Sequence, residues 1–419
     1  MNTDCTDQTD EDERNPINPK ILRQREKMKI LHVITSLQTG GAEMLVVNLM
    51  PRFKALGHEV GVVVFNGEHT ALMERLEKEC PECKIYRLGT SCYNPWYIIK
   101  LIGIMRKYDV VHTHNSSPQL FAAIANIFCR KRLITTEHNT NNRKRGNWLL
   151  SRIDKWMYPR YEKIICISDQ AEENLREYLA YPCPLPEGKG SLSPDPSPKG
   201  KGESVECSEG NKTQNLKLKT NITTIYNGVD VEAIHKAEPI ESLNSERFVA
   251  VMVAGFRPQK DQDTLVRAMA KLPKDQYEVW LVGDGVRRDS VERLVSNVGV
   301  KDNVKFLGLR TDVANILKTA DVVVMSTHYE GLSLSNIEGM AAGKPFVASD
   351  VEGIHEVTEG YGVLVTHEDA DALADIIRRL HDDENYYNEI AERCYERAIQ
   401  FDISEMVARY NAVYCGTTR

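Results

Sequence analysis

The sequence predicts an α/β protein made of two consecutive doubly wound domains that face a central cleft. Three observations lead to this fold class. The chain has 419 residues, enough for two to three domains of about 150 residues each. Short apolar runs alternate with helix-length amphipathic segments along most of it. The alternation starts afresh near residue 246, which implies a second parallel sheet after the first.

The first half of the chain supplies six candidate strands. Several are apolar throughout rather than alternating, as expected of parallel strands that are buried on both faces. They span residues 29–34, 60–65, 109–113, 133–136, 163–167 and 223–226. A helix is expected over residues 44–56, after the first strand. Together these elements predict an N-terminal Rossmann-like domain over residues 28–240.

The segment at 182–215 interrupts this pattern. Six prolines fall between residues 182 and 198 of a chain that has 17 in all. Residues 184–190 and 196–202 form an imperfect duplication rich in glycine and lysine. Because such a segment buries too little apolar surface to offset its loss of conformational entropy, we expect a disordered surface insert.

The second half repeats the strand and helix pattern. Its candidate strands span residues 248–254, 277–282, 304–307, 321–325 and 345–348, and its clearest helices residues 261–272 and 290–298. They predict a C-terminal Rossmann-like domain over residues 246–400. Residues 401–419 are expected to form a helix that packs back on the N-terminal domain. Ligands of such folds bind at the carboxyl ends of the strands, so functional residues are expected in the loops that follow them.

Composition and charge exclude several classes of protein. Sixty acidic and 53 basic side chains give a net charge of -7, which argues against a nucleic-acid partner. No run reaches the ~18 to 20 apolar residues that a membrane span needs. Residues 1–27 are acid-rich and lack the apolar centre of a secretory signal. We therefore expect a cytoplasmic protein with a disordered acidic tail at 1–27.

The cysteines do not indicate a disulfide framework or a zinc site. Ten cysteines are irregularly spaced in a long chain, and a cytoplasm would keep them reduced. Cys80 and Cys83 form one CxxC pair, but no second pair or nearby histidine completes a zinc set.

Two segments have the residue types of a phosphate and sugar site. Gly40 and Gly41 lie at a strand-to-helix turn, where glycine lets the backbone approach a phosphate. Their spacing does not fit the GxGxxG motif, which weakens a nicotinamide interpretation. Glu330 and Glu338, separated by seven residues, flank a loop that opens a helix near Ser335. Helix amides there can hold a phosphate while the carboxylates accept sugar hydroxyls; the alternative is two solvated surface charges.

At these residues the sequence resembles family 4 of the retaining glycosyltransferases, which have the GT-B fold. The strongest part is the run from Glu330 through the Glu-Gly-Met-Ala-Ala-Gly-Lys-Pro segment at 338–345. Residues 40–41, 227–230, 258–261 and 282–285 are also similar to the family. The resemblance covers residues 28–400 apart from the insert.

The resemblance implies an activity. A sugar would pass with retention from a UDP- or GDP-linked nucleotide-sugar, held by the C-terminal domain, to an acceptor held by the N-terminal domain. The acceptor would be a saccharide or a lipid-linked saccharide of surface polysaccharide, lipopolysaccharide or glycolipid synthesis. A front-face mechanism is implied, in which the leaving phosphate helps to deprotonate the acceptor.

The resemblance also implies roles for individual residues. Glu338 would hold ribose hydroxyls, Glu330 would bind the transferred sugar, and Lys260 would pair with the phosphates. His138 matches the family position that contacts the donor sugar. The implied catalytic residues are thus His138, Glu330 and Lys260, and the implied nucleotide-sugar ligands are Gly40, Gly41, Arg257, Lys260, Ser333, Leu334, Ser335 and Glu338.

One position departs from the family pattern. The family commonly has an arginine five residues before the lysine, where this chain has Gly255. Arg257 is a candidate to supply the missing guanidinium, and the alternative is a surface charge beside Pro258.

Two patterns suggest a metal without making a site. His112 and His114 lie on one face of a strand, but no acidic or cysteine ligand is near in sequence, so we interpret them as cleft wall. Residues 261–263 spell Asp-Gln-Asp, the motif that transferases of another fold use for a metal. Here it precedes an amphipathic helix, where aspartate is a common cap. We expect no cofactor and no obligatory metal.

A basic and aromatic region is a candidate membrane contact. Arginine, lysine and tryptophan gather over residues 130–163, most densely at 143–163. Such a segment can lie on an anionic membrane and would bring the protein to a lipid-linked acceptor at the inner face. The alternative is a solvated helix whose Trp148 and Trp156 pack inward.

Two other functions remain open at this stage. A nucleotide-sugar epimerase of the same two-domain shape would convert its substrate without an acceptor. A non-catalytic nucleotide-sugar-binding protein would keep the fold without the chemistry.

Overall fold

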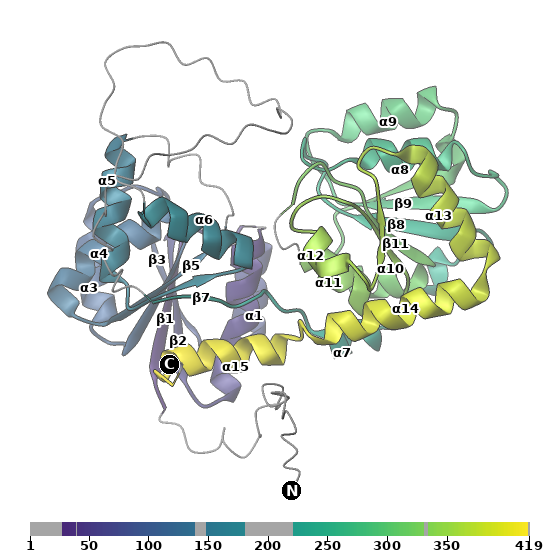
Figure 1. Ribbon diagram of the computed structural model, residues 1–419. Helices are drawn as coiled ribbons and strands as arrows, with labels where there is room; N and C mark the ends of the chain where they lie inside the picture. The colour runs from purple at the N-terminus through teal and green to yellow at the C-terminus, as the bar shows by residue number, and fades with distance from the viewer. Residues whose placement is uncertain (1–26, 39, 139–147, 181–220, 331–333, 418–419) are drawn as a thin grey trace, which may run out of the picture.

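The computed structural model describes residues 27–38, 40–138, 148–180, 221–330 and 334–417. Two α/β domains lie side by side in this part of the chain (Figure 1). Most of the expected acidic tail, the whole insert at 182–215 and Ser333 lie outside the described residues.

The N-terminal domain is built on a seven-stranded parallel sheet of order β3-β2-β1-β4-β5-β6-β7. Its strands are β1 (Lys29–Ile34), β2 (Glu59–Asn66), β3 (Lys84–Gly89), β4 (Val110–His114), β5 (Arg132–Glu137), β6 (Lys163–Cys166) and β7 (Asn221–Thr224). Its helices are α1 (Gly41–Ala55), α2 (Ala71–Glu79), α3 (Trp96–Met105), α4 (Ser116–Cys129), α5 (Trp148–Met157) and α6 (Asp169–Ala180), with a 3-10 turn at Tyr158–Arg160. The central strands are apolar because helices cover both faces of the sheet.

The C-terminal domain has a six-stranded parallel sheet of order β10-β9-β8-β11-β12-β13. Its strands are β8 (Phe248–Val253), β9 (Tyr277–Val282), β10 (Val304–Gly308), β11 (Val322–Met325), β12 (Phe346–Ser349) and β13 (Val363–Val365). Its helices are α7 (Val231–His235), α8 (Gln262–Met269), α9 (Arg288–Asn297), α10 (Val313–Thr319), α11 (Leu334–Ala341), α12 (His355–Thr358), α13 (Ala370–Asp382) and α14 (Glu384–Ile399). Short 3-10 turns lie at Glu241–Leu243 and Lys301–Asn303.

The predicted fold class is confirmed: both sheets are parallel and doubly wound. In each, the strand order reverses beside the first strand, β1 in one domain and β8 in the other. Such a reversal opens a crevice at the carboxyl ends of the strands, which is where ligands bind in this architecture.

The C-terminal helix α15 (Ile403–Tyr414) crosses back to the N-terminal domain. It runs on from α14 and lies near α1, with the C-terminus beside the N-terminal sheet (Figure 1). The chain crosses between the domains twice, and the two crossings are hydrogen-bonded: the Val229 amide donates to the Phe401 carbonyl at 3.1 Å, and the Ile403 amide donates to the Val229 carbonyl at 2.8 Å. The apolar side of α15 joins the core under β1 and α1.

Within the described ranges, every helix is too short or too polar to cross a bilayer.

Candidate active site

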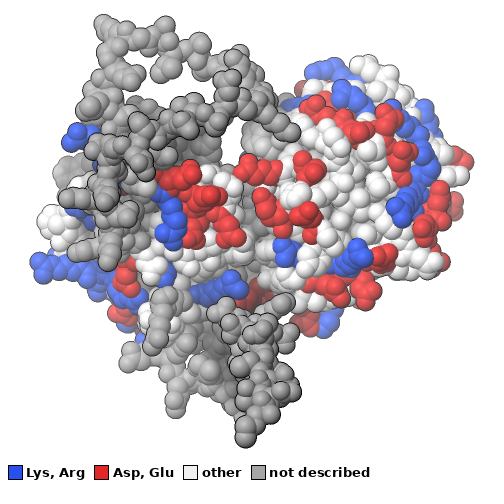
Figure 2. All heavy atoms as spheres, in the orientation of Figure 1, with Lys and Arg blue, Asp and Glu red and all other residues white. Residues whose placement is uncertain are grey.

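A cavity of about 1370 Å³ lies between the two domains. Its walls come from the loops at the carboxyl ends of both sheets and from α11. Acidic side chains gather where the two domains meet (Figure 2). The acidic residues that line the cavity are Glu43, Asp169, Glu173, Glu330, Glu338, Glu352, Glu356, Asp402 and Glu405. Four basic side chains, Arg257, Lys260, Arg397 and Arg409, also line it.

Helix α1 begins at the cavity. Gly40 is its N-cap residue, with extended backbone, and the Met44 amide donates to the Gly40 carbonyl at 3.0 Å. A Cβ on Gly40 would lie 2.3 Å from an Oε2 atom of Glu43, whereas a Cβ on Gly41 would meet open space. The Glu43 carboxylate therefore lies against the glycine turn, and burial raises its pKa. The free amides of this helix start give the N-terminal wall a partial positive charge.

Lys260 and Glu330, two of the expected catalytic residues, form an ion pair. Lys260 follows β8 and is held by a backbone bridge to Thr327, which follows β11. Both side chains are largely buried, with exposed fractions of 10% for Lys260 and 15% for Glu330. The Glu330 carboxylate thus offsets the charge of Lys260 near the carboxyl ends of the adjacent strands β8 and β11.

The turn that carries Lys260 is fixed from behind by two glycines. Gly283 and Gly285 follow β9 and have φ values of +133° and +154°. A Cβ on Gly283 would lie 2.3 Å from the Ala254 carbonyl oxygen, and one on Gly285 would lie 2.5 Å from the Phe256 carbonyl oxygen. Only glycine lets the two turns approach this closely.

Arg257 lies in the same turn and lines the cavity with an exposed side chain. Its Nε atom lies 3.5 Å from the point where Gly255 would carry a Cβ. The guanidinium thus passes beside the position at which the family commonly has arginine.

Glu338 projects from α11 toward the cavity, which Leu334 and Ser335 at the start of the helix also line. Burial raises the pKa of Glu338. Among the described residues, no hydrogen bond or ion pair is recorded for this carboxylate, so its oxygens are available to a ligand. Of the residues that the resemblance assigns to this loop, Ser333 lies outside the described residues.

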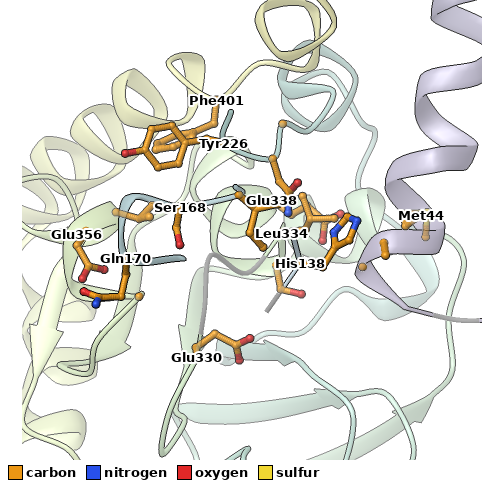
Figure 3. A pocket seen from close by; sticks show the side chains of 18 of the residues that line it. Met44, His138, Ser168, Gln170, Tyr226, Glu330, Leu334, Glu338, Glu356 and Phe401 are labelled. Atoms are coloured by element: carbon orange, nitrogen blue, oxygen red, sulfur yellow. The ribbon is translucent and has the colours of Figure 1, made fainter. Parts of the chain in front are cut away.

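His138 follows β5 on the opposite wall and lines the same cavity. Figure 3 shows His138, Glu330 and Glu338 around one space, with Leu334 between the last two. The Nε2 atom of His138 lies 2.9 Å from Nδ1 of His114. Burial lowers the pKa of His138 to about 4, so the ring is neutral at physiological pH.

The interpretation of His112 and His114 as cleft wall is wrong. Both side chains are fully buried beneath the cavity rather than in its lining. The alternation of β4 does place them on one face of the strand, but α15 covers that face. Sequence spacing cannot show this cover, because α15 comes almost 300 residues later.

Asp261 is a helix cap, as expected. Its carboxylate accepts from the Thr264 amide at 3.1 Å at the start of α8 and from the Ser326 hydroxyl at 3.1 Å. Asp263 pairs with Arg287 at 2.8 Å instead of sharing a ligand with Asp261. His328 and His367 have ring nitrogens within 4.8 Å of an Asp261 oxygen, but they hydrogen-bond each other at 2.8 Å.

Other residues of the cavity were not identified from sequence. Asn115 follows β4 with φ of +68°, and Ser168 and Gln170 follow β6. Tyr226 and Phe401 belong to the two domain crossings (Figure 3). The positions of Asn115 and Ser168, directly after predicted strands, are the signal that could have found them.

Comparisons with known proteins agree with this architecture. The family model described as Glycosyl transferases group 1 matches residues 234–400, and the model described as Glycosyltransferase Family 4 matches residues 39–185. The N-acetyl-alpha-D-glucosaminyl L-malate synthase of Bacillus anthracis is 25% identical, over 91% of this chain and 95% of its own length. The UDP-Gal:alpha-D-GlcNAc-diphosphoundecaprenol alpha-1,3-galactosyltransferase of Escherichia coli is 25% identical, over 76% of this chain and 78% of its own length.

Solved structures share the fold. The Anabaena HepE structure in complex with UDP-glucose superposes with a TM-score of 0.71 at 21% identity, and the match covers 92% of this chain and 100% of HepE.

Proposed function

Because the chain belongs to family 4 of the retaining glycosyltransferases and has their GT-B fold, we propose that it transfers a sugar from a UDP-linked nucleotide-sugar to a saccharide or lipid-linked saccharide acceptor. The observation that carries the proposal is the shared cavity, which collects Lys260, Glu330 and Glu338 from one domain and His138 and the start of α1 from the other. Its volume exceeds the ~300 to 1,000 Å³ of common ligand pockets, which suits two substrates at once.

The nucleotide would lie against the C-terminal wall. Glu338, whose carboxylate has no partner among the residues that the structure describes, would accept hydrogen bonds from the ribose hydroxyls, and the start of α11 would offer amides to the diphosphate. UDP is favoured over GDP because HepE is described in complex with UDP-glucose and the Escherichia coli relative is named for UDP-Gal. A GDP-linked sugar is the other outcome of the test below.

The transfer breaks the bond from the anomeric carbon to the diphosphate oxygen and forms a bond from that carbon to the acceptor oxygen. Negative charge builds on the leaving diphosphate, and Lys260 and Arg257, which line the cavity, would stabilise it together with the helix amides opposite. The acceptor proton passes to a phosphate oxygen in the proposed front-face mechanism, so the protein need not supply a base. Glu330 then orients both Lys260 and the transferred sugar.

A surface on the N-terminal domain suits a membrane-bound acceptor. Helices α3, α4 and α5 expose large apolar side chains beside lysines and arginines, and Arg160 stacks 3.6 Å over the Trp156 ring. The exposed side chains are Trp96, Ile99, Ile127, Phe128 and Trp156. Trp156 is 37% exposed, which does not agree with the alternative that it packs inward, while the Trp148 side chain and residues 143–147 lie outside the description.

Liposome binding tests this surface. Wild-type protein should sediment with vesicles that contain anionic lipid at physiological salt, and the Trp96→Ser/Phe128→Ser variant should stay in the supernatant. Tyr329→Ser, which removes an aromatic side chain that is 61% exposed on the other domain, is the control and should sediment like wild type. Equal sedimentation of all three proteins would rule the surface out.

A thermal-shift panel followed by a product assay tests the activity. UDP and one UDP-sugar should stabilise the wild type, since a ligand that binds only the folded state adds RT ln(1 + [L]/Kd) to its stability. Product should then form only when an acceptor is present. An epimerase would instead convert the UDP-sugar with no acceptor, and a binding protein would show the thermal shift with no product.

A further inference from the structure

A continuous row of hydrogen bonds runs from His138 through the N-terminal core to α15. His138 Nε2 lies 2.9 Å from His114 Nδ1, and His114 Nε2 lies 2.9 Å from His32 Nδ1. His32 Nε2 is 3.2 Å from the Tyr414 hydroxyl, which is 2.5 Å from His112 Nδ1. His112 Nε2 is 2.8 Å from the Thr136 hydroxyl, and the row ends 3.3 Å further at the hydroxyl of Tyr410. We call these seven residues the histidine row.

Each imidazole ring in the histidine row carries one N–H proton, and each hydroxyl carries one O–H proton. His32, His112, His114, Tyr410 and Tyr414 have no exposed surface. Burial lowers the pKa of His32 to about 3 and those of His112 and His114 well below their ordinary value, and it raises the pKa of both tyrosines. Every histidine is therefore neutral at physiological pH, with one ring nitrogen that donates and one that accepts.

A metal is not needed to explain the cluster. His32, His112 and His114 offer nitrogens within 4.8 Å of one another, which alone would suggest a metal site. However, both nitrogens of each of these rings already have a hydrogen-bond partner. The row is satisfied as a hydrogen-bonded network.

Such a row can point in only two directions. In the first, the Tyr410 hydroxyl donates to Thr136, Thr136 to His112, and so on to His138 Nε2. Every histidine then carries its proton on Nδ1, and His138 has an N–H left for the cavity. In the second, all donors reverse, every histidine carries its proton on Nε2, and His138 Nδ1 becomes an acceptor. One ring cannot change alone, because two donors or two acceptors would then face each other.

The Tyr410 end distinguishes the two directions. In the first, its hydroxyl proton is donated to Thr136. In the second, Thr136 donates to Tyr410, and no further acceptor for the buried tyrosine hydroxyl is recorded among the residues that the structure describes. An unsatisfied buried donor is costly. The other end has no such cost, because His138 faces the cavity, where water or substrate can pair with either form (Figure 3).

We propose that the histidine row fixes His138 as the Nδ1–H tautomer, so that His138 presents a hydrogen-bond donor to an oxygen of the bound sugar substrate. The tautomer is then set from the buried end of the row at Tyr410, which does not touch His138 and belongs to a helix that follows the other domain. The proposal rests on the proposed function in one respect, since a nucleotide-sugar in the cavity gives the N–H its partner. The tautomer itself is a property of the unliganded protein.

Nitrogen NMR of the full chain tests the tautomer without any ligand. Protein labelled with ¹⁵N at histidine should show the Nδ1–H pattern in long-range ¹H–¹⁵N spectra for His32, His112, His114 and His138, with each signal assigned by a single His→Gln variant. The Nε2–H pattern at His138, or mixed tautomers along the row, overturns the proposal. The spectrum does not depend on activity, so failure of the proposed function leaves this result readable.

A tyrosine variant tests how the direction is set. Tyr410→Phe leaves the Thr136 hydroxyl as the buried end of the row. In the reversed direction the Thr136 proton would have no acceptor among the residues that the structure describes, so His138 should keep the Nδ1–H tautomer. The matched control is Tyr387→Phe, which loses a partly buried hydroxyl that donates to the Asp321 carbonyl at 2.8 Å in the other domain. It should leave the His138 signals unchanged. The Nε2–H pattern, or a mixture of both tautomers, in folded Tyr410→Phe protein would overturn the argument that the buried end of the row sets its direction.

Discussion

Lys260 and Glu330 pair opposite charges on side chains that are largely buried in the cavity wall. Removing one partner of a buried pair strands the other charge, whereas removing both does not. Lys260→Met should lower the free energy of unfolding by about 3 kcal/mol, the lower end of the range for buried pairs because both groups reach the cavity. The Lys260→Met/Glu330→Gln double variant should regain much of that loss. Urea unfolding of the wild type, Lys260→Met, Glu330→Gln and the double variant measures the coupling energy between the two side chains. Additive losses of unfolding free energy would show that they do not interact.

Glu338 carries a cost for folding that its ligand role would explain. Because burial raises its pKa above the ordinary value of 4.5, the folded state prefers the protonated form. The ionised carboxylate therefore destabilises the fold at neutral pH, and this penalty disappears as the pH falls toward the ordinary value. Glu338→Gln should raise the melting temperature at pH 7, and the gain should shrink as the pH is lowered.

The same variant should bind UDP more weakly. Hydrogen bonds to a charged group contribute about 1.5 to 3 kcal/mol, so Glu338→Gln should bind UDP at least about tenfold more weakly. Thermal scans with and without UDP at pH 7 measure both effects on one sample. A variant that is more stable but binds UDP like wild type would assign the ribose to another residue.

At the residue scale, the sequence indicated those candidate residues that lie within local motifs, but not the contacts between distant positions. Lys260, Glu330 and Glu338 could be proposed from sequence because they lie in the segments that follow β8 and β11, and all three line the cavity. The ion pair between two of them could not, since it joins positions 70 residues apart. The histidine row was further out of reach, because Tyr414 meets His32 only after the whole C-terminal domain has intervened.

The glycine turn after β9 is the element that supports the part of the cavity wall formed by Arg257 and Lys260. Gly285→Ala would force a non-glycine residue to φ of +154° and put its Cβ 2.5 Å from the Phe256 carbonyl oxygen. Strain of this kind costs about 1 to 3 kcal/mol, and the clash would displace the turn that carries Arg257 and Lys260. We expect both lower stability and weaker UDP binding.

Gly308→Ala is the matched control for this element. Gly308 also has a positive φ, of +66°, but a Cβ there would meet open space. Gly308→Ala should lower the free energy of unfolding by only about 1 to 2 kcal/mol, the cost of a left-handed backbone for alanine, and should leave the affinity for UDP unchanged. Calorimetric UDP titration of both folded variants decides between them, and equal affinity would show that the turn does not position the wall.

Element prediction missed two of the four edge strands. β3 and β13 were not identified, whereas the edge strands β7 and β10 and the central strands were found within one or two residues. β3 reads Lys-Ile-Tyr-Arg-Leu-Gly and keeps only Leu88 buried, and β13 has three residues. An edge strand packs against fewer neighbours, so its sequence needs less apolar character and gives a weaker signal.

At the scale of the whole molecule, the hydrophobic core of the N-terminal domain is completed by helix α15 from the end of the chain. This core includes six side chains of α15: Ile403, Met406, Val407, Tyr410, Val413 and Tyr414. The crossing from α14 is also tied to the first crossing at Val229. The end of the chain thus fastens the two domains together and buries the histidines beneath the cavity.

Deletion of residues 402–419 should therefore unfold more than a helix. It would expose the apolar faces of β1 and α1, whose side chains Ile30, Val46 and Phe53 are fully buried, and it would leave His32 and His112 without the Tyr414 hydroxyl. Each of several buried side chains contributes about 1.5 to 3 kcal/mol to the free energy of unfolding. Their combined loss is therefore comparable to the whole stability of a typical domain, about 5 to 15 kcal/mol. We expect the truncated chain to bind a hydrophobic dye and to aggregate in size-exclusion chromatography, while its C-terminal domain keeps a separate melting transition. Deletion of residues 417–419, which follow α15, is the control and should behave like wild type; a truncated chain with both transitions intact would show that the N-terminal domain folds without α15.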